Sequence, residues 1–260
     1  MKEKAVSSAP TSAPFGATHA PAEQASPDDV VRAALHAFAE GGYDGTRLDA
    51  LAKGTGMSKR MIHYHFGDKK GLYVRALHLA LSQLAPPEDI MNRSYAVPVE
   101  GMRRFADALF YAFMEHPDAV RLVIRENVDP VLEDEEAALL PGANDVTLHV
   151  ERLLLAGQDA GAFRPGVSAA DLLILTTSLC FFRVGSGVTA LHVGRVDVED
   201  TRNIEGIRRL VVDAVLAFLT SNIPSAGYDS YVQPASAPDP DDAVPQSDFS
   251  DVYGDGGRLV

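Results

Sequence analysis

Cysteine is nearly absent from this chain, with Cys180 the single example among 260 residues. One cysteine cannot form an internal disulfide, and it excludes the cysteine pairs on which zinc fingers depend. The cysteine content therefore suits a reducing compartment, and we expect a cytoplasmic protein.

Long hydrophobic runs are also missing. The most apolar stretch, residues 172–182, is interrupted by Thr176-Thr177-Ser178 and followed by Arg183. It is shorter than the roughly 20 apolar residues that span a bilayer. The N-terminal residues carry two early lysines but no apolar core of a secretory signal. We expect no membrane association, and a buried helix at 172–182.

Enzyme signatures are not found either. The chain has no G-x-S-x-G, phosphate-binding loop, dinucleotide glycine fingerprint or H-E-x-x-H. His63 and His65 flank Tyr64, but no third metal ligand at a suitable spacing is evident. These absences predict a protein without catalytic residues, metal or cofactor.

Basic residues are few overall but concentrated in one segment. The formal net charge is −13, yet residues 53–75 hold six lysines and arginines and one acid, Asp68. A local basic face attracts DNA whatever the total charge. On charge alone, a solvated helix surface explains the same pattern.

The basic segment overlaps a predicted helix-turn-helix at residues 46–66. Leu48, Leu51 and Ala52 have helical spacing, and Gly54-Thr55-Gly56 supplies a turn. Ser58 is a good N-cap for a second helix that begins Lys59-Arg60. Such a helix is suited to the DNA major groove. Thr46 with Asp49 predicts a capping box for the first helix of the pair.

Helices are predicted on both sides of this motif. Ser26-Pro27 begins one, with apolar rows from Val30 to Ala39, and Gly41-Gly42 ends it. Gly67-Asp68 supplies a turn and a cap for a longer helix, which stops before Pro86-Pro87. The first helix is expected to pack against the two helices of the motif.

These residues resemble the N-terminal domain of tetracycline-repressor-type transcription regulators. The resemblance covers about 50 residues, VVRAALHAFAEGGYDGTRLDALAKGTGMSKRMIHYHFGDKKGLYVRAL, in particular A-F-A-E-G-G-Y, L-x-x-L-A, G-M-S and Y-H-F-G-D-K-x-x-L. Two departures are Gly54, where alanine is usual, and His63, where an aromatic residue is common.

The resemblance implies DNA contacts by residues of the helix-turn-helix. Lys59, Arg60 and Met61 match base-reading positions, although Met61 could also pack inward. Thr46, Ser58, Tyr64 and Lys69 match phosphate-binding positions, with capping and packing as their alternative roles. The predicted DNA-binding residues are Thr46, Arg47, Ser58, Lys59, Arg60, Met61, His63, Tyr64 and Lys69.

Residues 88–223 read as helices with apolar stripes, which the resemblance identifies as a ligand-binding and dimerisation domain. Helices near 168–192 and 204–222 have more apolar surface than one neighbour covers, and Ser168 to Asp171 predicts a cap for the first. Cys180 is predicted to be a small buried apolar residue.

An effector pocket is predicted in this domain from aromatic and basic side chains. The candidates are Phe105, Phe110, Phe113, Arg121, His149, Phe181 and Arg183. Aromatic residues at helical spacing are more often core, and a lone arginine is more often paired with a carboxylate such as Glu126 or Glu151.

The sequence thus predicts an all-α homodimer of about nine helices, with a three-helix head and a larger helical body. The expected divisions are a disordered arm (1–25), the DNA-binding domain (26–72), the ligand-binding and dimerisation domain (73–224) and a disordered acidic tail (225–260). The expected function is a repressor that leaves an inverted-repeat operator in double-stranded DNA when an unknown small-molecule effector binds. The alternatives are a helical ligand-binding or adaptor protein with a non-functional head, and a helical enzyme.

Overall fold

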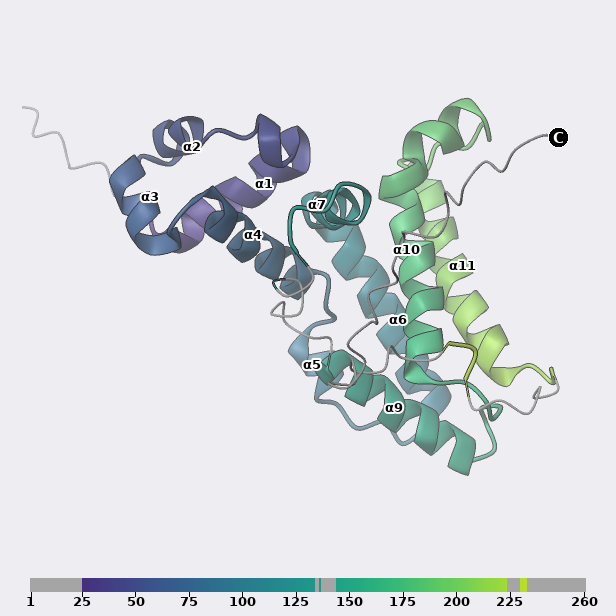
Figure 1. The fold of residues 1–260 in the computed structure, drawn as a ribbon. Coiled ribbons are helices and arrows are strands. Elements are labelled where there is room, and N and C mark those ends of the chain that lie inside the picture. The colour runs from purple at the N-terminus through teal and green to yellow at the C-terminus, as the bar shows by residue number, and fades with distance from the viewer. Residues whose placement is uncertain (1–24, 134–135, 137–143, 224–229, 233–260) are drawn as a thin grey trace, which may run out of the picture.

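The computed structural model describes residues 25–133, 136, 144–223 and 230–232. These residues form ten helices and no strand, as the all-α prediction expected (Figure 1). The predicted arm lies outside the described residues except for residue 25, and the predicted tail does so except for residues 230–232.

Three helices form the head, one of 19 residues and two of eight. They are α1 (Pro27–Gly45), α2 (Leu48–Thr55) and α3 (Lys59–Phe66). Ser26 caps α1 in a capping box with Asp29, and the Ser58 hydroxyl accepts a hydrogen bond from the Met61 N–H. Gly56 turns the chain between α2 and α3 in the left-handed conformation that glycine allows. The predicted helix-turn-helix is confirmed.

The prediction for Thr46 was wrong. Arg47 occupies the N-cap of α2 without a side-chain cap, and the buried Thr46 hydroxyl instead donates to the carbonyls of Ala37 and Gly42. Gly42, at φ 71°, breaks the helical path of α1 but does not end the helix, which resumes for a last turn to Gly45. Thr46 therefore ties that bent end together because its hydroxyl reaches two carbonyls of α1.

A long helix, α4 (Lys69–Gln83), leads from the head into the body (Figure 1). Asp68 caps it, as predicted. The body comprises α5 (Glu88–Met91), α6 (Pro98–Glu115), α7 (Pro117–Val128), α9 (Asn144–Asp159), α10 (Ala169–His192) and α11 (Thr201–Thr220). A capping box of Ser168 and Asp171 begins α10, as the sequence predicted.

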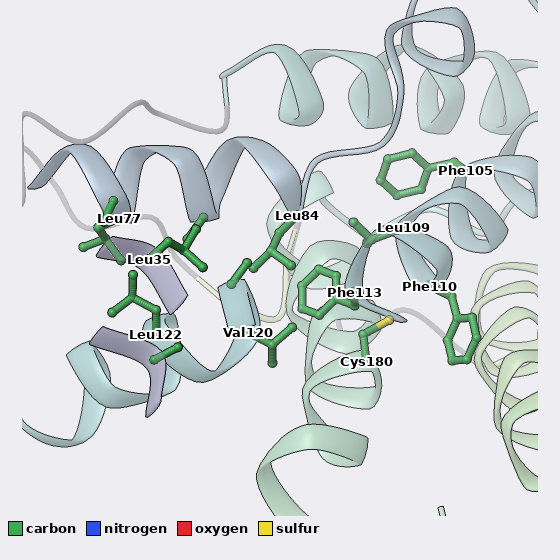
Figure 2. Close-up of a cluster of buried hydrophobic side chains, with 14 of the residues drawn as sticks. Leu35, Leu77, Leu84, Phe105, Leu109, Phe110, Phe113, Val120, Leu122 and Cys180 are labelled. Atoms are coloured by element: carbon green, nitrogen blue, oxygen red, sulfur yellow. The ribbon is translucent and has the colours of Figure 1, made fainter. Parts of the chain in front are cut away.

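One apolar core runs through head and body. Leu35 of α1, Leu77 of α4 and Leu122 of α7 meet at the junction, and Phe105 and Phe113 of α6 continue the cluster into the body (Figure 2). Cys180 is buried in the same cluster, and burial raises the pKa of its thiol to about 12. The continuous packing indicates that head and body are mechanically connected rather than joined by a linker.

Residues 230–232 are held against the body, inside the stretch predicted as a disordered tail. Asp171 at the start of α10 accepts hydrogen bonds from the backbone N–H groups of Tyr231 and Val232 and from the Ser230 hydroxyl. Arg164 donates to the Tyr231 hydroxyl at 2.7 Å. The expectation of disorder was therefore wrong for these three residues, because a buried carboxylate binds their backbone.

Candidate DNA-binding surface and effector cavity

The outer face of α3 is exposed and carries the side chains expected to reach DNA. Ile62 alone of its eight residues is buried, and it anchors the helix to the core. Tyr64 is 79% exposed and Met61 is 40% exposed, so the alternative that Met61 packs inward does not hold. The Tyr64 ring is too exposed to be stabilised by the core, and it is available to contact a partner.

The basic residues of the head surround this face. Arg47, Lys53 and Arg60 are exposed and form no ion pair with any described residue. Lys59 pairs with Asp49 of α2 at 2.9 Å, and both side chains are largely exposed. An exposed pair of this kind is weak, so Lys59 can exchange Asp49 for a phosphate or base at little cost.

The predicted phosphate-binding residues divide into two groups in the structure. Ser58 is exposed at the N-terminus of α3, where free N–H groups and the helix dipole favour an anion. The Lys69 ammonium lies 4.4 Å from the centre of the Tyr43 ring, and His63 Nδ1 lies 2.7 Å from the Gly67 carbonyl oxygen. Thr46 differs from these because its side chain is buried and its hydroxyl is already bonded.

A cavity of about 470 Å³ opens in the body between α4, α6, α7, α9 and α10. Phe113 of α6 and Phe181 of α10 meet edge to face across it, with ring centres 5.0 Å apart. Leu84, Leu109 and Phe113 lie close together beside it (Figure 2). Its lining residues are Leu81, Ser82, Leu84, Ala85, Pro86, Leu109, Phe113, Val123, Asn127, Asp145, Val146, Leu173, Thr177 and Phe181.

Only two of the seven predicted pocket residues, Phe113 and Phe181, line this cavity. Phe105 and Phe110 are buried core residues on the same helix. Arg121 pairs with Asp118 at 2.8 Å, and Arg183 pairs with Glu199 at 2.6 Å. These four do not form the cavity wall, since their side chains are used by the core or by carboxylates.

His149, the remaining predicted pocket residue, does not line this cavity either. It is buried at a smaller cleft beside α5.

The polar residues of the cavity were missed by the sequence prediction. Ser82, Asn127, Asp145 and Thr177 come from four different helices, and Asp145 is the only charged residue among the described lining residues. Each lies in an ordinary helical context with no local signal. Only the packing of the helices brings them together.

Helix α7 connects the cavity with the head. Val123 and Asn127 line the cavity, whereas Arg125 donates to the carbonyls of Ala39 and Glu40, at 2.7 and 2.8 Å, near the bent end of α1. A guanidinium is favourable there because the C-terminal end of a helix is negative.

A second tie joins α7 to α4. Tyr73 of α4 donates to Glu126 Oε2 at 2.6 Å, and burial and this carboxylate raise the Tyr73 pKa. The same carboxylate accepts from the backbone N–H of Leu132 at 3.0 Å. Helix α7 thus lines the cavity with some side chains and holds α1 and α4 with others.

Helices α10 and α11 leave an apolar stripe exposed. On α10 it includes Ile174, Phe182 and Val188, of which Val188 is 74% exposed, and on α11 it includes Leu210. By length and composition, α10 is the one helix of the described residues that could cross a membrane. The prediction of a buried helix at 172–182 was therefore only partly right: the helix extends over 24 residues, and Leu172, Thr176 and Cys180 are buried whereas one face of it is exposed.

Two models of a single family match the chain. Residues 30–76 match "Bacterial regulatory proteins, tetR family", and residues 98–215 match "Tetracyclin repressor-like, C-terminal domain". The first match runs from α1 of the head into α4, and the second runs from the start of α6 into α11. Together they take in more than half of the 260 residues.

Individual relatives agree with these matches. The transcriptional repressor NicS of Pseudomonas putida is 25% identical over 174 residues, which are 66% of this chain and 82% of that protein. The transcriptional regulator RutR of Escherichia coli is 30% identical over 108 residues, or 41% of this chain and 50% of that protein. The structure of PfmR from Thermus thermophilus shares the fold, with a TM-score of 0.56 at 23% identity over 75% of this chain and 97% of that one. The exposed helix-turn-helix, the helical body and these matches agree: the chain belongs to the tetracycline-repressor family of bacterial transcription regulators.

Proposed function

We propose that this protein is a cytoplasmic, homodimeric repressor that binds an inverted-repeat operator and leaves it when a small molecule enters the α4–α10 cavity. The observation that carries the proposal is the exposed, basic outer face of α3 on an otherwise acidic protein. The name of the relative NicS, a transcriptional repressor, supports the direction of control.

DNA recognition falls to the exposed residues of the head. Lys59, Arg60 and Met61 at the start of α3 would read base edges in the major groove. Ser58, Tyr64 and Lys69 would hold phosphates, with Arg47 and His63 beside them. Thr46 would act indirectly, by fixing the end of α1 that precedes α2.

Dimerisation is supported by the exposed stripe on α10 and α11. A soluble protein rarely leaves Ile174, Phe182, Val188 and Leu210 in water together, and a second copy related by two-fold symmetry would cover them. Such a dimer also explains the apolar length of α10 without a membrane. Two heads would then face successive major grooves of one operator.

The effector would be a neutral or cationic, largely apolar molecule. The described lining of the cavity has no lysine, arginine or histidine, and its single charge is the carboxylate of Asp145. An anionic effector would lose its hydration without gaining a counter-charge, which is costly. Asn127, Ser82 and Thr177 can supply the few directed hydrogen bonds that orient an apolar ligand.

Release from DNA would pass through α7. A ligand that displaces Val123 or Asn127 moves the helix that carries Arg125 and Glu126, and these residues hold α1 and α4. The ligand acts to the extent that it binds the displaced arrangement more tightly. Small changes in head spacing suffice, because both heads must fit one operator.

The test begins with an operator selected from random duplex DNA and measured by mobility shift. We expect Lys59→Ala/Arg60→Ala/Tyr64→Ala to lower operator affinity by at least about 100-fold, since each good base contact contributes about 1–3 kcal/mol. The control, Arg195→Ala/Arg202→Ala, removes two arginines of the body and should change affinity less than about twofold. Equal affinity of the triple variant and the wild type would refute the assignment of α3.

Salt dependence separates the repressor from an adaptor with a non-functional head. True phosphate contacts make the affinity fall steeply with salt, and the triple variant should have a shallower slope. An adaptor would show weak binding with no selected sequence. The catalytic alternative has no support from a specific observation, since the relatives named above are regulators.

A further inference from the structure

A small cleft separate from the effector cavity lies between α9 and the loop that follows α5 (α5 and α9 are neighbours in Figure 1). Its volume is about 170 Å³, and it shares no described lining residue with the larger cavity. It is built from residues 91–95 on one side and from His149, Arg152, Leu153 and Ala156 on the other. The lining includes no aspartate or glutamate.

Two polar atoms at this cleft are buried without a hydrogen-bond partner among the described residues. They are His149 Nε2 and the Tyr95 hydroxyl, two of only four such atoms in the described part of the chain. His149 is 3% exposed, and its ring lies against Phe105 with ring centres 5.9 Å apart. Burying a polar group without a hydrogen-bond partner costs about 1–3 kcal/mol. The presence of two such atoms at one cleft therefore indicates that a ligand supplies their partner.

Two arginines add positive charge to the same cleft. Arg93 and Arg152 both line it, and neither forms an ion pair with a described carboxylate. Arg93 instead lies 5.8 Å from the Tyr95 ring centre, and Arg152 donates only to the Leu148 carbonyl at 3.3 Å.

The chain has 36 acidic and 23 basic residues, yet neither guanidinium meets a described carboxylate. Other arginines of the described body either pair with a carboxylate, as Arg103 and Arg208 do, or donate to uncharged oxygens, as Arg164 does. Guanidinium groups left free in so acidic a protein are available for an anion from solution.

We infer that this cleft is a binding site for a small organic or inorganic anion, distinct from the apolar effector cavity. The arginine pair holds the carboxylate or phosphate group, and Tyr95 and His149 hydrogen-bond a second polar group such as a hydroxyl. At roughly 30 Å³ for a water-sized group, the cleft accommodates an anion of about five or six non-hydrogen atoms.

The location gives the anion a structural effect. The cleft and the cavity lie along the same helix, since Asp145 and Val146 line the cavity while His149 and Arg152 line the cleft. An anion that bridges α9 to residues 91–95 would fix the wall of the effector cavity. Anion and effector would therefore influence each other's affinity by the same factor.

The test uses the full-length protein with ¹⁵N-labelled histidine. The His149 ring signals are assigned with His149→Gln and followed while lactate, propionate, lactamide or inorganic phosphate is added at constant ionic strength. We expect a saturable shift with lactate or phosphate and none with neutral lactamide. A saturable shift with phosphate but not with lactate identifies a phosphate site. A saturable shift with lactate but not with phosphate identifies a carboxylate site.

Variants separate this site from general ion binding. Arg93→Gln/Arg152→Gln should weaken anion binding at least about tenfold, whereas Arg195→Gln, at an arginine of another loop, should leave it unchanged. Tyr95→Phe should weaken the binding of lactate roughly two- to tenfold and leave the binding of propionate, which lacks the hydroxyl, unchanged. It should not lower the melting temperature, since it removes a buried group that has no partner.

A shift that rises linearly without saturation, or one that is the same in Arg93→Gln/Arg152→Gln, would overturn the inference. So would equal binding of lactate and lactamide. None of these outcomes depends on operator binding or on the apolar effector.

Discussion

The head and the body use their side chains in different ways. In α3 of the head, one of eight residues is buried, whereas in α6 of the body eight of eighteen are. Helices α2 and α3 of the head therefore rely on caps and on single anchors, Leu51 and Ile62, and leave most of their remaining side chains available to DNA. The body uses its side chains for a core, a cavity and an apolar stripe. A substitution on the outer face of α3 should therefore alter DNA binding, whereas a substitution in the packed core of the body should alter stability.

The largest expected effect tests the tight packing of the body. At Gly157 of α9, an added Cβ would lie 1.9 Å from Cδ2 of Phe163 and 2.3 Å from Cε2. Gly157→Ala should lower the free energy of unfolding by about 1–3 kcal/mol, as overpacking a filled core does. Urea unfolding followed by circular dichroism measures it. An unchanged midpoint would show that the body tolerates displacement of Phe163.

A smaller effect is expected where residues 230–232 join the body. Asp171→Asn removes the charge that accepts their N–H groups and should cost about 1 kcal/mol. Burial alone would raise the Asp171 pKa, but hydrogen bonds from the backbone of Ser168, Tyr231 and Val232 outweigh it and lower the pKa below 3.8.

The lowered pKa of Asp171 determines how its contribution to stability depends on pH. Because the folded pKa is lowered, the carboxylate stabilises the protein above pH 3.8, and the contribution is lost as the pH falls through the folded value. The wild type and Asp171→Asn should therefore converge in stability below pH 3.8. A constant difference between them down to pH 2 would contradict this account.

The smallest effect is expected in the head and has the opposite sign. Gly54 lies near the end of α2 with nothing within 4 Å of the position an added Cβ would take. Gly54→Ala should raise the free energy of unfolding by about 0.5–1 kcal/mol, through helix propensity alone. It repeats the chemical change of Gly157→Ala without the clash. A loss of stability at both positions would remove the contrast between head and body.

The head could be predicted from sequence where its structure depends on neighbouring residues. The bounds of α3 follow from the Ser58 cap and from Gly67, both of which act within a few residues. Thr46 was misassigned because its hydroxyl donates to the carbonyls of Ala37 and Gly42, nine and four residues upstream, and so does not cap the helix that follows.

The cavity could be predicted only in part. Phe105 and Phe113 belong to the same apolar stripe of α6, but only Phe113 reaches the cavity. Periodicity shows which face of a helix turns inward, and it does not show which end of that face meets a cavity. Arg93 and Arg152, 59 positions apart, line the same cleft only because the loop after α5 packs beside α9.

The dependence of the head on the body is tested most directly at Arg125. This residue touches neither the outer face of α3 nor the described cavity lining, yet it holds the carbonyls of Ala39 and Glu40. The measurement is operator affinity by fluorescence anisotropy for Arg125→Met, with Arg121→Met as the control on the same helix. Arg121 contacts the head only through an exposed pair with Glu40, at 3.2 Å.

We predict that Arg125→Met weakens operator binding roughly three- to thirtyfold, because heads that are not held in place must be ordered on DNA. Arg121→Met should change it less than about twofold. An Arg125→Met protein that is folded, dimeric and as tight as the wild type on its operator would contradict control of the head through α7.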